Sequence, residues 1–108
     1  MVQPRLIIHG GAGSALEAAG LETIRTSLTA VITETYPLLQ RGETAATAVI
    51  RACQLLEDDP HFNAGTGSVL QSDGQIRMSA SLMQGESQTF SGVINVSRVR
   101  HPVLMAEA

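Results

Sequence analysis

The sequence predicts an α+β fold in which helices flank an antiparallel sheet, and the chain is long enough, at 108 residues, for one domain or part of one. Apolar residues recur at helical spacing between Leu21 and Thr35, and a second helical stretch begins near Thr44. Between residues 76 and 82 they instead alternate with polar residues, which is the period of a half-buried strand.

The start of the chain predicts a buried strand, formed by Leu6, Ile7 and Ile8, that runs into a glycine loop at residues 10–13. Adjacent glycines allow unusual φ angles and let main-chain N–H groups point at a ligand. The loop has no Walker lysine, and it contains only the first half of the dinucleotide-binding fingerprint. A tight backbone turn and a ligand-binding loop therefore both remain open.

The first helix has a clear apolar face. Its members recur every three or four positions: Ile24, Leu28, Val31 and Thr35. Pro37 is expected either to end this helix or to kink it, and Gly42 stands at a natural C-cap position.

The second helix is expected to begin after Thr44, a plausible N-cap, and to stop at the Asp-Asp-Pro sequence of residues 58–60. Small side chains on its buried face would allow a close approach to a sheet. That face is predicted to hold Ala45, Val49, Ala52 or Cys53, and Leu56.

The second half of the chain predicts strands. Val69 leads to Asp73–Gly74, a strong hairpin signal, which the alternating residues 76–82 follow. Another β-run spans roughly residues 90–96, and a helix with Pro102 in its first turn comes last. About four strands and two full helices would leave one sheet face uncovered, so we expect an incomplete domain.

Composition excludes several classes of protein. The net charge is −3 without a Lys/Arg cluster, so no nucleic-acid partner is expected. The apolar run at residues 6–8 is too short for a signal sequence or a membrane span. Cys53 is the only cysteine, which rules out an internal disulfide and favours a reducing compartment. We therefore expect a cytoplasmic protein that binds neither nucleic acid nor membrane.

The densest polar stretch, residues 56–67, contains three carboxylates, but its spacing is not that of an EF-hand. Its simplest interpretation is a helix C-terminus with solvated acids, in which His61 is a loop histidine. No second His or Cys stands at zinc spacing, and the chain has no G-x-S-x-G elbow. Cys53 lies on an apolar helical face, which indicates a buried structural thiol.

Taken together, the motifs resemble one family. Residues 7–13 (IIHGGAG) resemble the opening strand and loop of plant-type asparaginases, and residues 62–69 (FNAGTGSV) match their F-N-A-G-x-G-S-V segment. Residues 78–85 (MSASLMQG) resemble the M-D-A-S-x-M-D-G strand, while SGV at 91–93 and HPV at 101–103 fall where the family has G-A-V and N-P-[IV]. The chain thus resembles the isoaspartyl peptidase/L-asparaginase family of N-terminal-nucleophile (Ntn) hydrolases.

The resemblance implies an αββα sandwich made as one precursor, which cuts itself before a threonine. That threonine becomes the N-terminus of the β subunit, and its hydroxyl attacks asparagine or an isoaspartyl dipeptide with its own α-amino group as base. Residues 1–108 would be the N-terminal portion of the α subunit, paired with the β subunit in an (αβ)2 heterotetramer. Gly65-Thr66 lies inside the F-N-A-G motif, so the resemblance places no nucleophile in this chain, which alone is expected to be inactive.

The resemblance also implies supporting residues. Asn63 would lie near the catalytic threonine and order the site, and Gly10 and Gly11 would form the loop behind that threonine. The family carries a sodium-binding loop built from main-chain carbonyls, and a hard cation does prefer several oxygens. Matched residue by residue, the ligands would be the carbonyls of Leu56, Glu57, Asp59, Phe62, Ala64 and Thr66. No organic cofactor is implied.

Two residues depart from the family pattern: Ser79 and Gln84 replace aspartates, which predicts altered local packing or slower self-cleavage. Aspartylglucosaminidase and threonine aspartase share the implied fold. Two other readings are a non-catalytic anion-binding module and a degenerate paralogue that does not cleave itself. The family's groups that bind the substrate carboxylate lie mostly in the β subunit, so the choice between isoaspartyl dipeptides and L-asparagine is made outside this chain.

Overall fold

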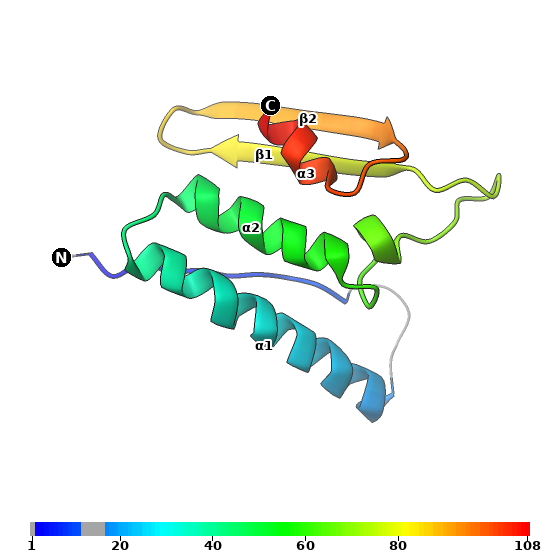
Figure 1. Ribbon diagram of the computed structural model, residues 1–108, viewed down its shortest axis with the longest axis horizontal. Helices are drawn as coiled ribbons and strands as arrows, with labels where there is room; N and C mark the ends of the chain where they lie inside the picture. The colour runs from blue at the N-terminus through cyan, green and yellow to red at the C-terminus, as the bar shows by residue number, and fades with distance from the viewer. Residues whose placement is uncertain (1, 12–16) are drawn as a thin grey trace.

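The computed structural model describes residues 2–11 and 17–108, and it is α+β as the sequence predicts. Two antiparallel helices lie beside a β-hairpin, and a short third helix packs between them (Figure 1). In chain order the elements are α1 (Ala18–Gln40), α2 (Ala45–Asp58), the 3-10 turn η1 (Gly65–Gly67), β1 (Met78–Gln84), β2 (Thr89–Val96) and α3 (Pro102–Glu107).

The apolar face predicted for α1 is confirmed, with Val31 and Thr35 fully inside. The buried Thr35 hydroxyl donates to the Val31 carbonyl at 2.8 Å, so its burial leaves no polar atom unpaired. Pro37 does not end the helix, which continues to Gln40. A proline this close to the C-terminus removes one helical hydrogen bond and leaves the last turn intact.

The turn between α1 and α2 follows the predicted capping. Gly42 has a φ of 89°, and its N–H donates to the Leu39 carbonyl while Glu43 N–H donates to Leu38, which is a Schellman motif. Thr44 is the N-cap of α2, because its Oγ1 accepts the Thr47 N–H at 3.1 Å. Both predictions are confirmed.

The buried face of α2 differs from the prediction. Ala52 is buried as predicted, and Cys53 and Leu56 are half-buried, but Ala45 and Val49 are exposed. Ala48 and Ile50 are buried instead. The helix lies between α1 on one side and η1 and α3 on the other, so it buries two stripes of residues rather than one. It ends at Asp58, as the Asp-Asp-Pro sequence predicts.

The β-hairpin is formed by β1 and β2 in antiparallel register, with Ala80 opposite Val93 and Met83 opposite Phe90. A β-bulge near the start of β1 coincides with Asn95, whose φ is 55°. The predicted alternation is confirmed along β1, where residues 78, 80 and 82 face inward. Ile76, predicted on the same face, lies before the strand and is exposed, so that part of the prediction is wrong.

The hairpin predicted at Asp73–Gly74 is wrong. A tight turn does form there, closed by the Gly74 N–H to the Gln71 carbonyl at 2.9 Å, but no strand flanks it. Val69 and Leu70, which precede the turn, are exposed, so they do not form the buried face of a strand. The chain instead reverses between β1 and β2, in a segment without Asn-Gly or Asp-Gly.

The strand predicted at residues 6–8 is also absent from the described residues, which contain two strands rather than four. Ile7 is 94% exposed, so the prediction that it is buried is wrong. The segment is held against α1 by Tyr36, whose hydroxyl donates to the Pro4 carbonyl at 2.8 Å. A strand needs a neighbour for its ladder, and within the described part of the chain β1 and β2 pair only with each other.

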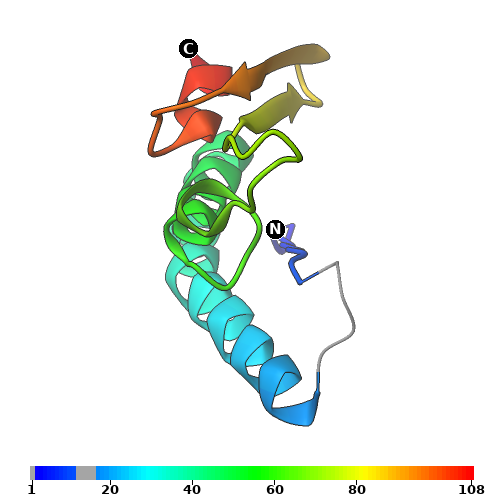
Figure 2. The same cartoon turned by 90° about the vertical axis from the view of Figure 1, so that its right-hand side faces the viewer.

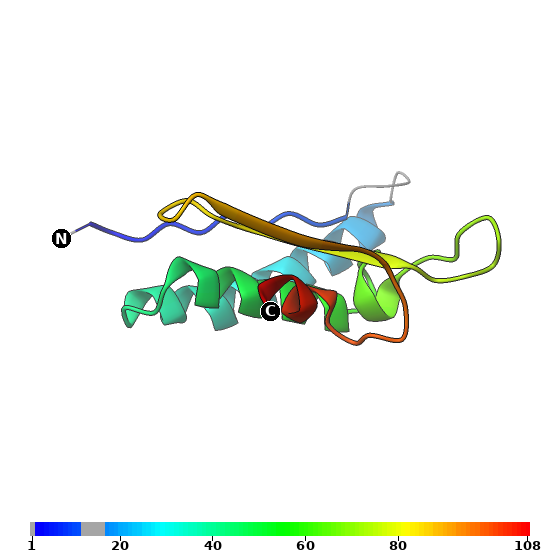
Figure 3. The same ribbon diagram turned by 90° about the horizontal axis from the view of Figure 1, so that it is seen from above.

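The molecule has two layers. The helices form one layer, and the N-terminal segment and the hairpin both lie on one face of that layer (Figures 2 and 3). Helix α3 covers the inner face of the hairpin, where Ser91 Oγ donates to the Ala106 carbonyl. None of the described residues covers the outer face, which carries Met83, Phe90 and Ile94 at 72%, 68% and 78% exposure.

Candidate functional site

The glycine loop and the loop that follows α2 meet in space. Gly10 lies directly against the ring of Phe62, because a Cβ added to Gly10 would stand 2.5 Å from Phe62 Cε1. The same methyl group would be 3.4 Å from the Leu28 side chain of α1. The structure thus brings Gly10 next to the segment that contains Asn63, and a larger residue would fit there only if the Phe62 ring moved.

Gly11 is placed over α1. Its φ is 90°, a conformation that glycine adopts without cost, and a Cβ would lie 3.0 Å from Ile24 Cγ2. Residues 12 and 13 of the predicted loop lie outside the described residues.

Asn63 holds its own loop together. Its Oδ1 accepts the Val69 N–H at 2.9 Å, so the side chain spans the turn that carries η1. The main chain also turns sharply at Asn63, because Ala64 N–H donates to the Phe62 carbonyl at 2.8 Å. The side chain is exposed, which leaves Asn63 accessible to a ligand.

Two glycines allow this loop to fold back on itself. A Cβ on Gly65 would overlap the Glu57 carbonyl oxygen, and one on Gly67 would overlap the Phe62 carbonyl and lie 2.7 Å from that of Pro60. Three main-chain oxygens therefore point at the backbone of η1. A residue with a Cβ atom would not fit at either position unless the main chain moved.

Carbonyls at the end of α2 lack their helical partners. Pro60 has no N–H to donate to Leu56, and the His61 N–H, which would reach Glu57, donates instead to the Asp59 side chain at 2.9 Å. Further along the loop, the carbonyls of residues 59, 62 and 64 each accept one main-chain N–H, which leaves each a second lone pair. Five of the six carbonyls predicted as sodium ligands, those of residues 56, 57, 59, 62 and 64, therefore have a lone pair that no main-chain N–H occupies.

Glu57 is not solvated, contrary to the interpretation of residues 57–59 as solvated acids. It is 6% exposed, and its Oε2 accepts the Val103 N–H at the start of α3 at 3.0 Å. Oε1 is buried and has no hydrogen-bond partner among the described residues. Burial, only partly offset by the Val103 N–H and by His101, raises the pKa of Glu57.

The next two acids also have partners. Asp58 binds Arg100 Nε at 3.1 Å and His101 Nε2 at 2.9 Å, and Asp59 Oδ1 lies 2.7 Å from His61 Nδ1. Partial desolvation on its own raises the pKa of Asp58, but the bonds from Arg100 and His101 outweigh it and the pKa is lowered. For Asp59, the His61 N–H and the neighbouring side chains likewise outweigh desolvation and lower the pKa.

Ser27, His61 and Asp59 lie together but do not form a catalytic triad. Both Ser27 Oγ, at 3.5 Å, and Asp59 Oδ1, at 2.7 Å, face the same ring nitrogen of His61, Nδ1. A triad needs the acid on one ring nitrogen and the hydroxyl on the other. The His61 side chain is 51% exposed, as expected for a loop histidine.

Cys53 is partly buried on α2. Burial, and then the negative charge of Glu57, raises the pKa of the Cys53 thiol. The thiolate is the reactive form, so this environment makes Cys53 a poor nucleophile and supports its interpretation as a structural thiol.

The two departures from the family pattern lie on β1. Ser79 is exposed, and Gln84 is exposed with its Oε1 accepting the Ser87 hydroxyl at 3.4 Å. Neither position is buried in this chain, so neither replacement leaves a polar atom without solvent.

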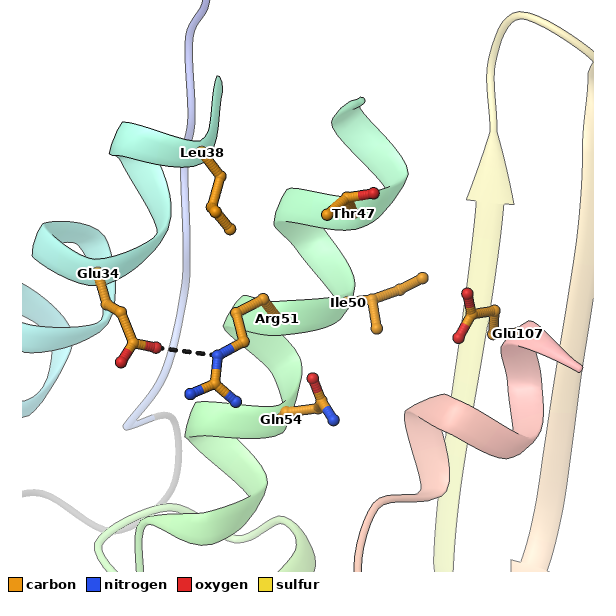
Figure 4. A pocket seen from close by; sticks show the side chains of 7 residues that line it. All are labelled: Glu34, Leu38, Thr47, Ile50, Arg51, Gln54 and Glu107. Atoms are coloured by element: carbon orange, nitrogen blue, oxygen red, sulfur yellow. Dashed lines mark hydrogen bonds and ion pairs between the residues drawn. The ribbon is translucent and has the colours of Figure 1, made fainter. Parts of the chain in front are cut away.

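A groove lies away from these loops, toward the turn that joins α1 and α2 (Figure 4). It contains the ion pair between Arg51 Nε and Glu34 Oε2, 3.0 Å long, and its floor includes Leu38 and Ile50. Both charged side chains are about half exposed, and none of the predicted site residues lines the groove.

Within residues 2–11 and 17–108, no three His, Cys, Asp or Glu side chains are grouped to hold a metal ion. In the same part of the chain, no helix has the length and apolar character needed to cross a membrane. The ligands predicted for sodium are main-chain carbonyls rather than these side chains.

Sequence reasoning missed the buried side chain of Glu57. A signal for it existed, because Glu57 stands seven residues after Ile50 and therefore on the same helical face. The predicted face omitted Ile50, and Glu57 was left out with it.

Fold and loops together define the class: an α+β segment in which a glycine loop backs an Asn-Ala-Gly-x-Gly loop at the end of a helix. Residues 2–108 match the family described as asparaginase. The chain is 65% identical over 107 residues to an isoaspartyl peptidase/L-asparaginase of Nostoc sp., covering 98% of this chain and 34% of the relative. The chain belongs to the asparaginase family.

Other relatives carry the same description. An isoaspartyl peptidase/L-asparaginase of Synechocystis sp. is 59% identical over 96% of this chain and 32% of its own length. One from Mus musculus is 40% identical over 94% of this chain and 31% of its own length. The chain therefore spans about a third of the length of the curated relatives it matches.

Proposed function

We propose that this chain is the front part of the α subunit of an isoaspartyl peptidase/L-asparaginase. The parent protein would hydrolyse β-aspartyl dipeptides and L-asparagine through a threonine freed by self-cleavage and located outside residues 1–108. The observation that carries this proposal is the 65% identity to a relative of that description across nearly the whole chain. The chain by itself, without a nucleophile, would be inactive.

The proposed architecture is the αββα sandwich of Ntn hydrolases. The hairpin and the N-terminal segment lie on the same side of the helices (Figure 3), where strands from elsewhere in the parent would join them. The apolar residues on the outer face of the hairpin, Met83, Phe90 and Ile94, would then be covered by the second sheet. The same arrangement would pair the exposed Ile7 segment in a ladder.

Asn63, Gly10 and Gly11 are proposed as supporting residues for the threonine. The contact between Gly10 and Phe62 supports this, because it places the glycine loop against the Asn63 loop. The side-chain oxygen of Asn63, Oδ1, already accepts the Val69 N–H, so the side-chain N–H₂ is the group offered to a ligand. An amide donor beside a nucleophile orders the site and stabilises developing negative charge.

A sodium ion is proposed at the end of α2. The main-chain carbonyls of this segment fit it, because those of Leu56 and Glu57 lack helical partners and others keep a second lone pair. When bound, the ion would supply a positive charge that holds these oxygens together and stiffens the loop carrying Asn63. The ligands would be the carbonyls of Leu56, Glu57, Asp59, Phe62, Ala64 and Thr66.

Thermal unfolding of the parent protein tests the sodium proposal. Replacing choline chloride by sodium chloride at equal ionic strength should raise the Tm, because an ion that binds only the folded state stabilises it by mass action. Equal melting temperatures in the two salts would refute the site. Potassium chloride serves as a control for a general effect of alkali cations.

The (αβ)2 assembly with a β subunit from the same precursor and a cytoplasmic location are part of the proposal. Relatives of the same description are about three times as long as this chain, which leaves enough sequence for a β subunit. The single cysteine supports a reducing compartment.

The direct test uses the full-length parent protein. Gel electrophoresis should show two subunits after expression, and the mature protein should release aspartate from a β-aspartyl dipeptide but not from the matched α-aspartyl dipeptide. An uncleaved single chain without activity would identify the degenerate paralogue. Phosphate binding in place of hydrolysis would point to the anion-binding module.

A further inference from the structure

The end of α2 contacts two other parts of the fold through one residue, Glu57. Its carbonyl oxygen and its Cβ lie against Gly65, the first residue of η1, where a Cβ would be 2.7 Å from that of Glu57. Its carboxylate Oε2 accepts the Val103 N–H of α3 at 3.0 Å. Figure 1 shows η1 and the start of α3 close to this end of α2. Glu57 therefore joins the loop of Asn63 to α3.

The energetics of this carboxylate suggest a specific role. Glu57 is only 6% exposed, and its second carboxylate oxygen, Oε1, has no hydrogen-bond partner within the described residues. Burying a carboxylate that is only half satisfied costs free energy, and an apolar side chain of similar shape is often neutral or stabilising in such a place. The contact with Val103 is therefore better explained by what it positions than by what it adds to stability.

Neighbouring contacts do not replace it. Asp58 also reaches this segment, but it binds the Arg100 and His101 side chains before α3 rather than the main chain of the helix. Helix α3 is in turn fixed to the hairpin, where Ser91 Oγ donates to the Ala106 carbonyl. A displacement of α3 would therefore reach the Asn63 loop through Glu57.

We propose that Glu57 is a positioning residue for the hydrolysis proposed above. Its side chain, bound to the Val103 N–H, fixes the end of α2 against α3, and its main chain fixes Gly65 and thereby Asn63. It acts through Asn63 and touches no substrate. This inference rests on the proposed function for its kinetic consequence, and on the contacts alone for its structural one.

Two variants of the parent protein separate anchoring from charge. Glu57→Gln keeps an oxygen that accepts the Val103 N–H, and it should keep kcat within about threefold of wild type. Glu57→Leu keeps the volume but leaves that N–H without an acceptor. Its kcat, calculated per molecule that has completed self-cleavage, should fall on the order of tenfold to a hundredfold. KM should change little, because a misplaced supporting group lowers the rate of the chemical step rather than substrate binding.

Glu34→Leu is the matched control. It removes a carboxylate that also links two elements, since Glu34 Oε2 binds Arg51 Nε between α1 and α2, but it lies away from the Asn63 loop. Its kcat should equal that of wild type. Hydrogen exchange followed by mass spectrometry, well below the melting temperature, should show faster exchange at residues 62–69 in Glu57→Leu and no change there in Glu34→Leu.

Three results would overturn the inference: wild-type kcat in Glu57→Leu, unchanged exchange at residues 62–69 in that variant, or a Gln variant as impaired as the Leu variant. If Glu57→Leu does not fold, Glu57→Gln decides, because a loss of kcat beyond about tenfold would contradict anchoring. If wild-type parent protein does not hydrolyse a β-aspartyl dipeptide, the proposed function fails, and the exchange experiment still tests whether Glu57 holds the loop.

Discussion

At the scale of single residues, several glycines stand where a methyl group would meet another part of the chain. Gly65 and Gly67 face main-chain oxygens, which cannot move without moving the loop, whereas Gly10 faces the ring of Phe62. The sequence predicts that glycines of this kind mark special backbone, but it does not reveal their neighbours. The Gly10 contact is the one that a second substitution can relieve.

Gly10→Ala in the parent protein should destabilise it by about 1–3 kcal/mol, because the added methyl overpacks against Phe62. In the background of Phe62→Leu, which removes the ring, the same substitution should cost clearly less. Chemical denaturation of the four proteins of this cycle measures the coupling. Additive effects would show that Gly10 and Phe62 do not touch.

Cys53 gives a prediction in pH. Burial, then the charge of Glu57, raises the pKa of its thiol, so the folded protein holds less thiolate at pH 8 than an unfolded chain does. Alkylation of Cys53 by iodoacetamide should be slow at pH 8, rise as the pH approaches the raised pKa, and become fast in urea. Quantifying the Cys53 peptide by mass spectrometry checks this, and equal rates in native and unfolded protein would contradict it.

At the scale of elements, the sequence predicts most accurately where local chemistry decides. The C-cap at Gly42, the N-cap at Thr44 and the inward residues of β1 depend on neighbours within a few positions. The predictions that failed depend on partners far along the chain. The segment at residues 6–8 lacks a neighbouring strand. Which residues of α2 are buried depends on its packing between α1 and α3.

Thr44→Ala should lower the free energy of unfolding of the parent protein by about 1 kcal/mol, because the Thr47 N–H loses its side-chain acceptor. Thr44→Ser, which keeps the hydroxyl, should remain within a few tenths of a kcal/mol of wild type. Urea denaturation compares the two. A serine variant as unstable as the alanine variant would mean that the threonine methyl, rather than the cap, carries the effect.

For the candidate site, the motifs in the sequence point to two loops but do not predict their geometry. That Gly10 meets Phe62 depends on how residues 2–11 pass along α1, which no local pattern encodes. The buried contact between Glu57 and Val103 joins positions 46 apart, and neither residue alone signals it. Whether Asn63 and the six carbonyls serve a nucleophile and a sodium ion stays a prediction.

At the scale of the whole molecule, the uncovered face of the hairpin should behave differently in the chain alone and in its parent. Phe90→Lys should lower self-association of the isolated 108-residue chain, because it breaks the apolar surface that Phe90 shares with Met83 and Ile94. In the parent, where a second sheet is proposed to cover this face, it should cost about 2–3 kcal/mol.

Glu86→Lys, in the exposed turn that joins β1 to β2, is the control and should change neither property much. Light scattering of the isolated chain and denaturation of the parent give the two readouts. A parent protein that tolerates Phe90→Lys as well as Glu86→Lys would show that the outer face stays in water.

The bare face of the hairpin also has a consequence during synthesis. In the proposed parent, of which this chain would be the front third, residues 1–108 would leave the ribosome first, with Met83, Phe90 and Ile94 in water. Translation at roughly 5–20 residues per second leaves that surface open for on the order of tens of seconds until the remaining strands emerge. Chaperones that bind nascent apolar segments should therefore engage residues 83–94 before later parts of the parent cover them.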